Sequence, residues 1–430
     1  MSASPRKLLR DRNFAWLMGG GVISALGDQF SLIALPWLVL KLSHDPATLG
    51  LVLALMGAPR AVLILFGGAV VDRHSPKAIL MLTKYVNTVL LALLAILVYS
   101  GGVTLTLAIA LALGLSLASA FSIPAGTSML PHVVAPAGLQ AANGMLMAIR
   151  QVTMLAGPLL AGLLFALAGD GSAGMRDARG LALAFGFDAF SFALSAWTLA
   201  KVRPLPMAMA APATPAPPGV LLQEVGAGIA AVWRDVTLRT AFLYWGLCSC
   251  VVGGVLQVAL PLLASTRLQG ASALGLLAGA QGAGALAGMA LAGLVGKRRI
   301  GNLGVTLLLL DGIIGLMVPL MGAITALWQG MLLLLAIGVL GGFVNVTVFS
   351  WVQQRVPKAM LGRTMSIFMF VVMGLAPLAA AAGGWIAGRV ALGALFVGAG
   401  LFLSGAALLA WLFTPMRRLS DQPLPATPTN

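Results

Sequence analysis

The sequence predicts an all-α integral membrane protein with twelve transmembrane helices in two pseudo-symmetric six-helix bundles. Of its 430 residues, 60% are hydrophobic and only 9% are charged, and the mean hydropathy is +1.01. In a soluble domain about 25% of the residues are charged, so this composition excludes a soluble enzyme. The apolar residues also fall in runs of roughly 20, the length at which a helix crosses about 30 Å of hydrocarbon.

The apolar runs give the spans in chain order. We expect them at residues 14–40, 47–71, 78–99, 103–124, 139–167, 180–200, 238–264, 271–295, 302–323, 326–349, 363–388 and 391–413. Six prolines between residues 201 and 222 exclude a continuous helix there and predict a semi-rigid linker. The predicted domains are an N-terminal six-helix bundle at 1–200, a Pro-rich cytoplasmic linker at 201–222, and a C-terminal six-helix bundle with a short cytoplasmic tail at 223–430.

Lysine and arginine are distributed unevenly between alternate loops. With the N-terminus inside, the inner segments hold 19 of the 26 Lys and Arg, Lys84 among them, and the opposite side holds 5. Cytoplasmic loops collect these residues, which predicts a multi-pass protein of the bacterial inner membrane with both termini cytoplasmic. The same bias accounts for the net charge of +15. No basic patch with interleaved aromatic residues indicates nucleic acid as a partner.

The two predicted halves share short sequence patterns. Gly-Pro-Leu at 157–159 in the fifth span matches Ala-Pro-Leu at 376–378 in the eleventh. A glycine followed four residues later by two charges occurs at 68–73 and again at 293–298. Two related six-helix halves are typical of transporters, in which one half rocks against the other.

The charged stretch Gly-Ala-Val-Val-Asp-Arg-His-Ser-Pro-Lys at 68–77 lies between the second and third spans. Its spacing resembles the signature loop of major facilitator superfamily transporters. Residues 27–40, 188–192 and 356–363 carry further similarity. Over essentially its full length the chain resembles this superfamily. Within it, the chain is similar to the drug/proton antiporter group that includes macrolide-type efflux pumps and siderophore exporters.

The resemblance implies the major facilitator fold and transport by alternating access. It also implies that the loop is a conformational latch made of Gly68, Asp72, Arg73 and Lys77. From the residues alone, Asp72 can cap a helix or pair with a guanidinium. The alternative is a solvated loop whose charges only set the topology.

The fifth span resembles the antiporter motif of drug exporters, whose core is Gly-Pro-x-x-Gly-Gly. Gly157, Pro158 and Gly162 match it, whereas Ala161 replaces one glycine and Thr153 replaces the glycine expected upstream. The partial match favours export over import.

Two charges lie deep within predicted spans, Asp28 about 21 Å and Arg60 about 18 Å from the inner side at 1.5 Å per residue. Ionisable groups at such depth are costly and usually functional. We expect Asp28, Arg60 and Arg150 to couple proton and substrate, with Asp28 binding a proton or a cationic substrate and Arg60 setting its charge state. The alternatives are a static Asp28–Arg60 pair that fixes helix packing, no meeting of the two, and a snorkelling Arg150.

Other polar and aromatic residues within the spans could line a cavity or pack between helices. The candidates for cavity lining are Phe121, Tyr244, Trp245, Gln257, Gln281 and Asn345. For Asp188 and Asp311 we expect a structural hydrogen-bonding role.

The sequence therefore predicts a proton-coupled exporter of small amphiphilic compounds, either drugs or a secreted metabolite, and not an enzyme. The alternatives are a lysophospholipid or other lipid transporter, and a transporter-like membrane sensor without turnover. We expect a proton gradient as the energy source, no cofactor and no metal, since all three histidines fall in loops. The expected partners are the substrate and membrane lipid, and we expect a monomer.

Overall fold

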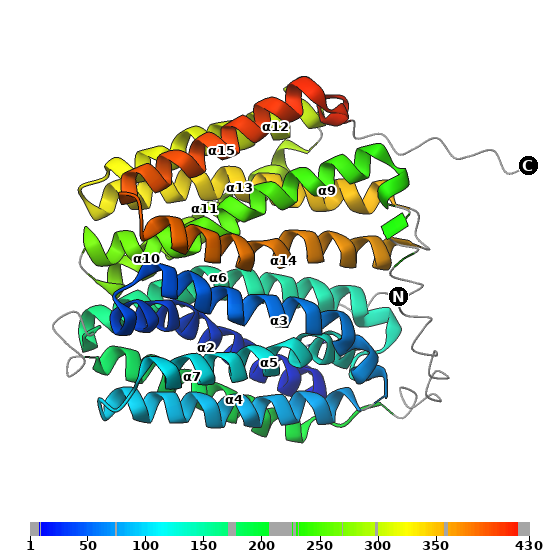
Figure 1. Cartoon of the computed structure of the whole chain (residues 1–430). Coiled ribbons are helices and arrows are strands. Elements are labelled where there is room, and N and C mark those ends of the chain that lie inside the picture. The colour runs from blue at the N-terminus through cyan, green and yellow to red at the C-terminus, as the bar shows by residue number, and fades with distance from the viewer. Residues whose placement is uncertain are drawn as a thin grey trace, which may run out of the picture. The chain divides into compact units, whose positions relative to one another are not determined.

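The computed structural model is built of helices (Figure 1). It describes residues 8, 10–73, 75–170, 178–205, 226, 229–230, 232–268, 270–296, 300–356 and 360–419, with only the backbone described for 64–73, 137 and 361–363. Within these ranges every regular element is helical, and twelve helices are long and apolar enough to cross a membrane. Each overlaps one predicted span, so the predicted fold class is confirmed.

Each of the first six spans is built on one α-helix. These helices are α2 (Arg12–Ser43), α3 (Pro46–Arg73), α4 (Pro76–Tyr99), α5 (Leu105–Met129), α6 (Leu139–Ala168) and α7 (Arg179–Lys201). The fourth span continues from α5 into a 3₁₀ segment η1 (Leu130–His132). Helix α7 packs closely against both α2 and α4. The α2–α7 approach uses glycine, since a Cβ on Gly20 would lie 3.1 Å from the Ser195 hydroxyl oxygen and 3.2 Å from its Cα.

The second six spans include two that change helix type. The seventh runs through α9 (Val236–Ser249), a π-helical segment η5 (Cys250–Val255) and α10 (Leu256–Thr266). The ninth continues from α12 (Leu303–Met317) into the 3₁₀ segment η6 (Val318–Ala323). The others are α11 (Ala271–Val295), α13 (Leu327–Arg355), α14 (Leu361–Ala387) and α15 (Leu392–Phe413).

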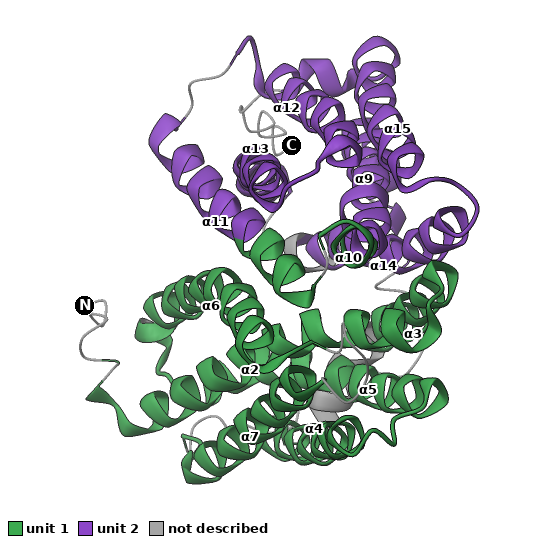
Figure 2. Cartoon of the chain, turned by 90° about the vertical axis from the view of Figure 1, so that its left-hand side faces the viewer, with its two compact units in different colours: residues 1–215, 260–279 green, residues 216–259, 280–430 purple. Residues whose placement is uncertain are grey.

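The chain forms two compact units (Figure 2). Unit 1 comprises residues 1–215 and 260–279, and unit 2 comprises residues 216–259 and 280–430. The end of the seventh span and the start of the eighth therefore belong to unit 1. The predicted domain boundaries stay a prediction, and most of the predicted linker, residues 206–222, lies outside the described residues.

Candidate transport site

The candidate site begins at Asp28, near the middle of α2, and at Arg60 on α3. Both side chains are exposed, although each lies within a long apolar helix. The carboxylate and the guanidinium interact electrostatically. No described residue makes a hydrogen bond or a direct ion pair with either group. Asp28 is therefore a carboxylate at mid-helix that remains open to a proton or a ligand.

Lys84 on α4 is a third charge at this site. Its side chain is only 7% exposed. Its Nζ donates to Ser195 Oγ of α7 at 2.5 Å and to Ser24 Oγ of α2 at 3.4 Å. It also lies 5.6 Å from the centre of the Phe192 ring and interacts electrostatically with Asp28.

The position of Lys84 corrects the sequence analysis. There it was counted among the charges of the inner loops, yet it is buried inside α4 among α2 and α7. The inner segments then hold 18 Lys and Arg against 5 on the opposite side, so the bias remains. Its place two turns inside an apolar span was a signal for Lys84, but a lysine there can either stay buried or extend its head to the interface, and the sequence does not decide between the two.

Asp188 on α7 brings a second carboxylate close to Asp28. It is 1% exposed. It accepts hydrogen bonds from the Ser31 hydroxyl and from Ser191 Oγ, the latter at 3.2 Å, and interacts electrostatically with Asp28. A Cβ on Gly27 would collide with the side chains of Ser191 and Asp188. The Gly-Asp pair at 27–28 thus combines a close helix contact with the open carboxylate, and the hydrogen-bonding role expected for Asp188 is observed.

The antiporter-like motif on α6 forms tight helix contacts. Gly157 faces the Gln29 side chain on α2, since a Cβ there would lie 2.5 Å from the Gln29 Cγ. A Cβ on Gly162 would lie 3.0 Å from the Ser272 carbonyl oxygen and 3.2 Å from the Gly275 Cα, both in the first turns of α11. Pro158 is buried between these positions.

A hydrogen bond and a second glycine strengthen this contact between α6 and α11. The Ala271 N–H donates to Asp170 Oδ2 at 2.5 Å, and the Trp37 Nε1 donates to the Asp170 carbonyl oxygen at 2.9 Å. A Cβ on Gly279 would collide with the Leu159 side chain. The motif residues act here as small surfaces that let helices meet.

Arg150 lies exposed on α6, about two turns before Gly157. In the part of the chain that the structure describes, no hydrogen bond or ion pair joins Arg150 to Asp28 or Arg60. The charges that interact electrostatically with Asp28 at this site include Arg60 and Lys84, and the coupling role expected of Arg150 stays a prediction.

The predicted latch is only partly described. Gly68, Asp72 and Arg73 lie in the last turns of α3, and their side chains fall outside the described residues. Lys77, in the first turn of α4, donates from Nζ to the carbonyl oxygens of Val202 at 2.7 Å and Ala200 at 3.4 Å. This contact ties α4 to the C-terminal end of α7 within unit 1.

A comparison with protein families identifies the superfamily of this chain. The model of the Major Facilitator Superfamily matches residues 17–381. The chain belongs to this superfamily. It is a multi-pass membrane transporter and not an enzyme, and it works by secondary transport with alternating access.

Solved structures of major facilitator transporters share this fold. The nucleoside transporter NupG aligns with 94% of this chain and 99% of its own, at 13% identity and a TM-score of 0.70. A bacterial homologue of the iron transporter ferroportin, in its inward-facing state, aligns with 93% of this chain and 98% of its own, at 17% identity and a TM-score of 0.65. A bacterial homologue of the human lysosomal transporter Spinster, in its inward-facing and occupied conformation, aligns with 99% of this chain and 100% of its own, at 15% identity and a TM-score of 0.68. Such identities show the fold alone. No curated protein sequence matches the chain.

In unit 2 of this major facilitator transporter, two predicted cavity residues lie in the hydrophobic core. Tyr244 and Trp245 are 4% and 5% exposed, and Trp245 makes edge contacts with Trp351 and Phe368. The Tyr244 hydroxyl donates to Asp311 Oδ2 at 2.9 Å. The structure thus packs both residues between helices and gives Asp311 the hydrogen-bonding role expected of it.

The other predicted lining residues are more accessible. Gln257 and Asn345 have exposed side chains. Gln281 and Phe121 are partly buried, the former in unit 2 and the latter in unit 1. Their assignment to a cavity stays a prediction.

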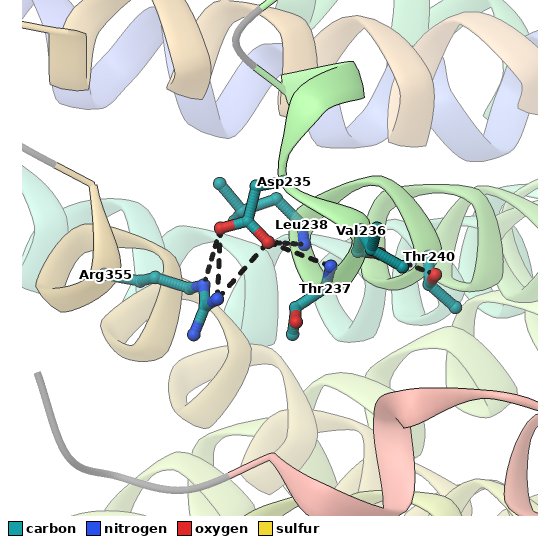
Figure 3. A network of polar contacts seen from close by, with 6 residues as sticks. All are labelled: Asp235, Val236, Thr237, Leu238, Thr240 and Arg355. Atoms are coloured by element: carbon teal, nitrogen blue, oxygen red, sulfur yellow. Dashed lines mark hydrogen bonds and ion pairs between the residues drawn. The ribbon is translucent and has the colours of Figure 1, made fainter. Parts of the chain in front are cut away.

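An ion pair lies at one end of unit 2, between Asp235 and Arg355 (Figure 3). Asp235 Oδ1 accepts from the Thr237 and Leu238 N–H groups at 2.9 and 3.1 Å and so caps α9. The same carboxylate binds the Arg355 guanidinium at 3.0–3.2 Å, which holds the end of α13 to the start of α9. Sequence reasoning missed the pair, although an Asp directly before an apolar run is a recognisable N-cap signal.

Proposed function

We propose that this transporter is a proton-coupled exporter of small amphiphilic compounds, either drugs or a secreted metabolite. One observation carries the proposal: Asp28 offers a mid-helix carboxylate with no described hydrogen-bond partner, next to Arg60 and Lys84. An ionisable group inside a membrane span is costly, and it is a functional candidate by default. Asp188 and Asp311, in contrast, have hydroxyl donors.

A single open carboxylate can exchange a proton for a cationic group. When Asp28 is ionised it can bind the cationic end of an amphiphile. When it takes up a proton, that attraction is lost and the compound is released. Exclusive binding of proton and substrate at one group is the basis of antiport, and a proton gradient would supply the energy. Arg60 and Arg150 would set the local charge against which this exchange takes place.

The contacts of α6 and the predicted topology support the direction of transport that we propose. The motif Gly157, Pro158 and Gly162 resembles that of drug exporters, and its glycines permit close contact with α2 and α11. With the inner-membrane location and cytoplasmic termini that we propose from the charge distribution, export would use the inward proton gradient. We further propose a monomer whose partners are the substrate and surrounding lipid.

The proposal is tested with the purified protein in proteoliposomes carrying an imposed pH gradient. Cationic dyes, macrolides and catecholates would be offered in turn, and their movement followed with and without the gradient. Gradient-driven movement of at least one amphiphile is the expected result. No gradient dependence for any compound overturns the antiport proposal. Scrambling of a labelled lysophospholipid would instead identify a lipid transporter, and binding without movement a sensor.

The matched pair Asp28→Asn and Asp11→Asn separates the site from general charge effects. Both remove one carboxylate from the α2 region. Asp11 caps α2 by accepting from the Phe14 N–H at 3.0 Å, and asparagine caps equally well. We expect loss of gradient-driven transport in Asp28→Asn alone. Equal activity of the two variants would remove Asp28 from the mechanism.

A further inference from the structure

We propose that Lys84 is the positioning residue for Asp28, a fixed internal cation that sets the pH at which Asp28 exchanges its proton. The inference rests on the proposed function for its effect on transport, although its first test below does not need transport. It is drawn from the place where α2, α4 and α7 meet in unit 1.

The position of the Lys84 ammonium is fixed by side chains from two other helices. Ser195 Oγ on α7 accepts at 2.5 Å and Ser24 Oγ on α2 accepts at 3.4 Å, while the Phe192 ring lies 5.6 Å away. Both serines are themselves buried. A lysine that only anchored a helix end would extend its head to the interface. This one ends inside the protein, and the site is built around it.

The charge next to this ammonium belongs to Asp28. Ser24, which accepts from the ammonium, lies one turn before Asp28 on α2, and the two charges interact electrostatically. Because Lys84 is only 7% exposed, salt screens this interaction less than it screens a surface pair. Asp188 on α7 also interacts with Asp28, but its carboxyl group is buried and accepts a hydrogen bond from the Ser31 hydroxyl. Asp28 is thus the carboxylate whose ionised form depends most directly on Lys84.

No other described charge can replace Lys84 from within the packed helices. Helix α5 carries no titratable residue, and Arg60 on α3 approaches Asp28 from an exposed position. Tyr85 on α4 is 55% exposed and follows Lys84 on another face of the helix. The remaining titratable groups lie on α6 or in the terminal turns of α2, α3, α4 and α7: Arg150, Arg12, Lys41, Asp72, Arg73, Lys77, Tyr99, Arg179 and Lys201.

This arrangement suits a group that must change charge repeatedly. When Asp28 takes up a proton, Lys84 loses a nearby negative charge but keeps its hydrogen bonds to the hydroxyls of Ser195 and Ser24. The packing of α2, α4 and α7 therefore does not depend on the charge of Asp28. When the proton leaves, the ammonium is still in position to favour the carboxylate.

Infrared spectroscopy of the protein in lipid tests the proposal without transport. The C=O stretch of protonated carboxyl groups is followed against pH, and the band lost in Asp28→Asn is assigned to Asp28. An opposite charge nearby favours the ionised carboxylate by about 1–3 pH units. We therefore expect Lys84→Met to move the midpoint of this band upward by about one unit or more, and Lys84→Arg to leave it within a few tenths.

Two further variants keep the result interpretable. Lys41→Met removes the same charge from the end of α2, where Lys41 lies over the Trp37 ring at 5.2 Å, and should leave the midpoint unchanged. Ser195→Ala removes the closest acceptor of Lys84 and should shift the midpoint by a smaller amount; it carries the test if Lys84→Met does not fold. An unchanged midpoint in both Lys84→Met and Ser195→Ala overturns the proposal, as does the absence of a titrating Asp28 band.

Transport in proteoliposomes separates this inference from the proposed function. If the wild type responds to a pH gradient, the pH profile of Lys84→Met should shift to higher pH, with restoration in Lys84→Arg. If the wild type shows no gradient response but the infrared midpoint shifts, the antiport proposal fails while the role of Lys84 stands. If the gradient drives transport but the infrared midpoint does not move, the antiport proposal stands and the role of Lys84 fails.

Discussion

Each half of the chain buries a carboxyl group within a membrane span, and the side chains around the two groups are different. They are Asp188 in the sixth span of the first half and Asp311 in the third span of the second half. In unit 1, α2, α4 and α7 bring together Lys84, Asp188 and four serines, next to the exposed Asp28. In unit 2, Asp311 on α12 accepts a hydrogen bond from Tyr244 on α9 and lies beside a core rich in aromatic residues. The first cluster is ionic and leads to an open carboxylate, whereas the second is closed.

This difference separates two uses of a buried acid. The Tyr244–Asp311 hydrogen bond joins two helices at one point, and both side chains are buried. The Tyr244 ring contacts Trp245, which in turn contacts Trp351 and Phe368. The Lys84 cluster joins three helices and extends to Asp28, whose charge can change without disturbing the hydroxyls around the ammonium. A duplicated architecture can thus keep a static polar contact in one half and a titratable site in the other.

The largest expected effect compares the two acids directly. We expect Asp28→Asn to lower gradient-driven transport by at least about tenfold, since it removes a group used in every cycle. Asp311→Asn should retain most transport, because the amide oxygen can still accept from the Tyr244 hydroxyl. Initial rates in proteoliposomes, normalised to the amount of folded protein, measure both. Similar losses in the two variants would end the functional distinction between the clusters.

A smaller effect is expected on stability at the α2–α7 contact. Gly27→Leu places a side chain where Ser191 and Asp188 already lie, and overpacking of this kind costs about 1–3 kcal/mol or more. Unfolding in mixed micelles of increasing SDS content measures the loss. Gly21→Leu is the matched control, because a Cβ there meets nothing within 4 Å. Equal stability of both variants would show that α2 and α7 are not tightly packed at Asp188.

The sequence was sufficient to predict the twelve membrane spans, because the thickness of the hydrocarbon layer sets the length of the apolar runs. It also singled out Asp28 and Arg60, because depth along a helix can be counted. It did not give Lys84 its place: whether a lysine two turns inside a span extends to water or stays buried depends on Ser24 and Ser195, which are far away in the chain. Tyr244 and Trp245 illustrate the same limit, since periodicity alone does not tell a core-facing aromatic ring from one that lines a cavity.

The smallest expected effect tests whether the unit 2 cluster is only structural. Tyr244→Phe removes the hydroxyl that donates to Asp311 Oδ2 at 2.9 Å and leaves a buried carboxyl group without that donor. The loss of such a hydrogen bond costs about 1–3 kcal/mol, which SDS titration can detect, while the pH profile of transport should coincide with that of the wild type. Ser195→Ala in unit 1 is the counterpart. It removes the closest acceptor of the buried Lys84 ammonium, so stability should fall by about 1–3 kcal/mol there too, but the pH profile should move as well. A shifted pH profile in Tyr244→Phe would show instead that Asp311 also takes part in proton exchange, and that both halves of the transporter carry a titratable site.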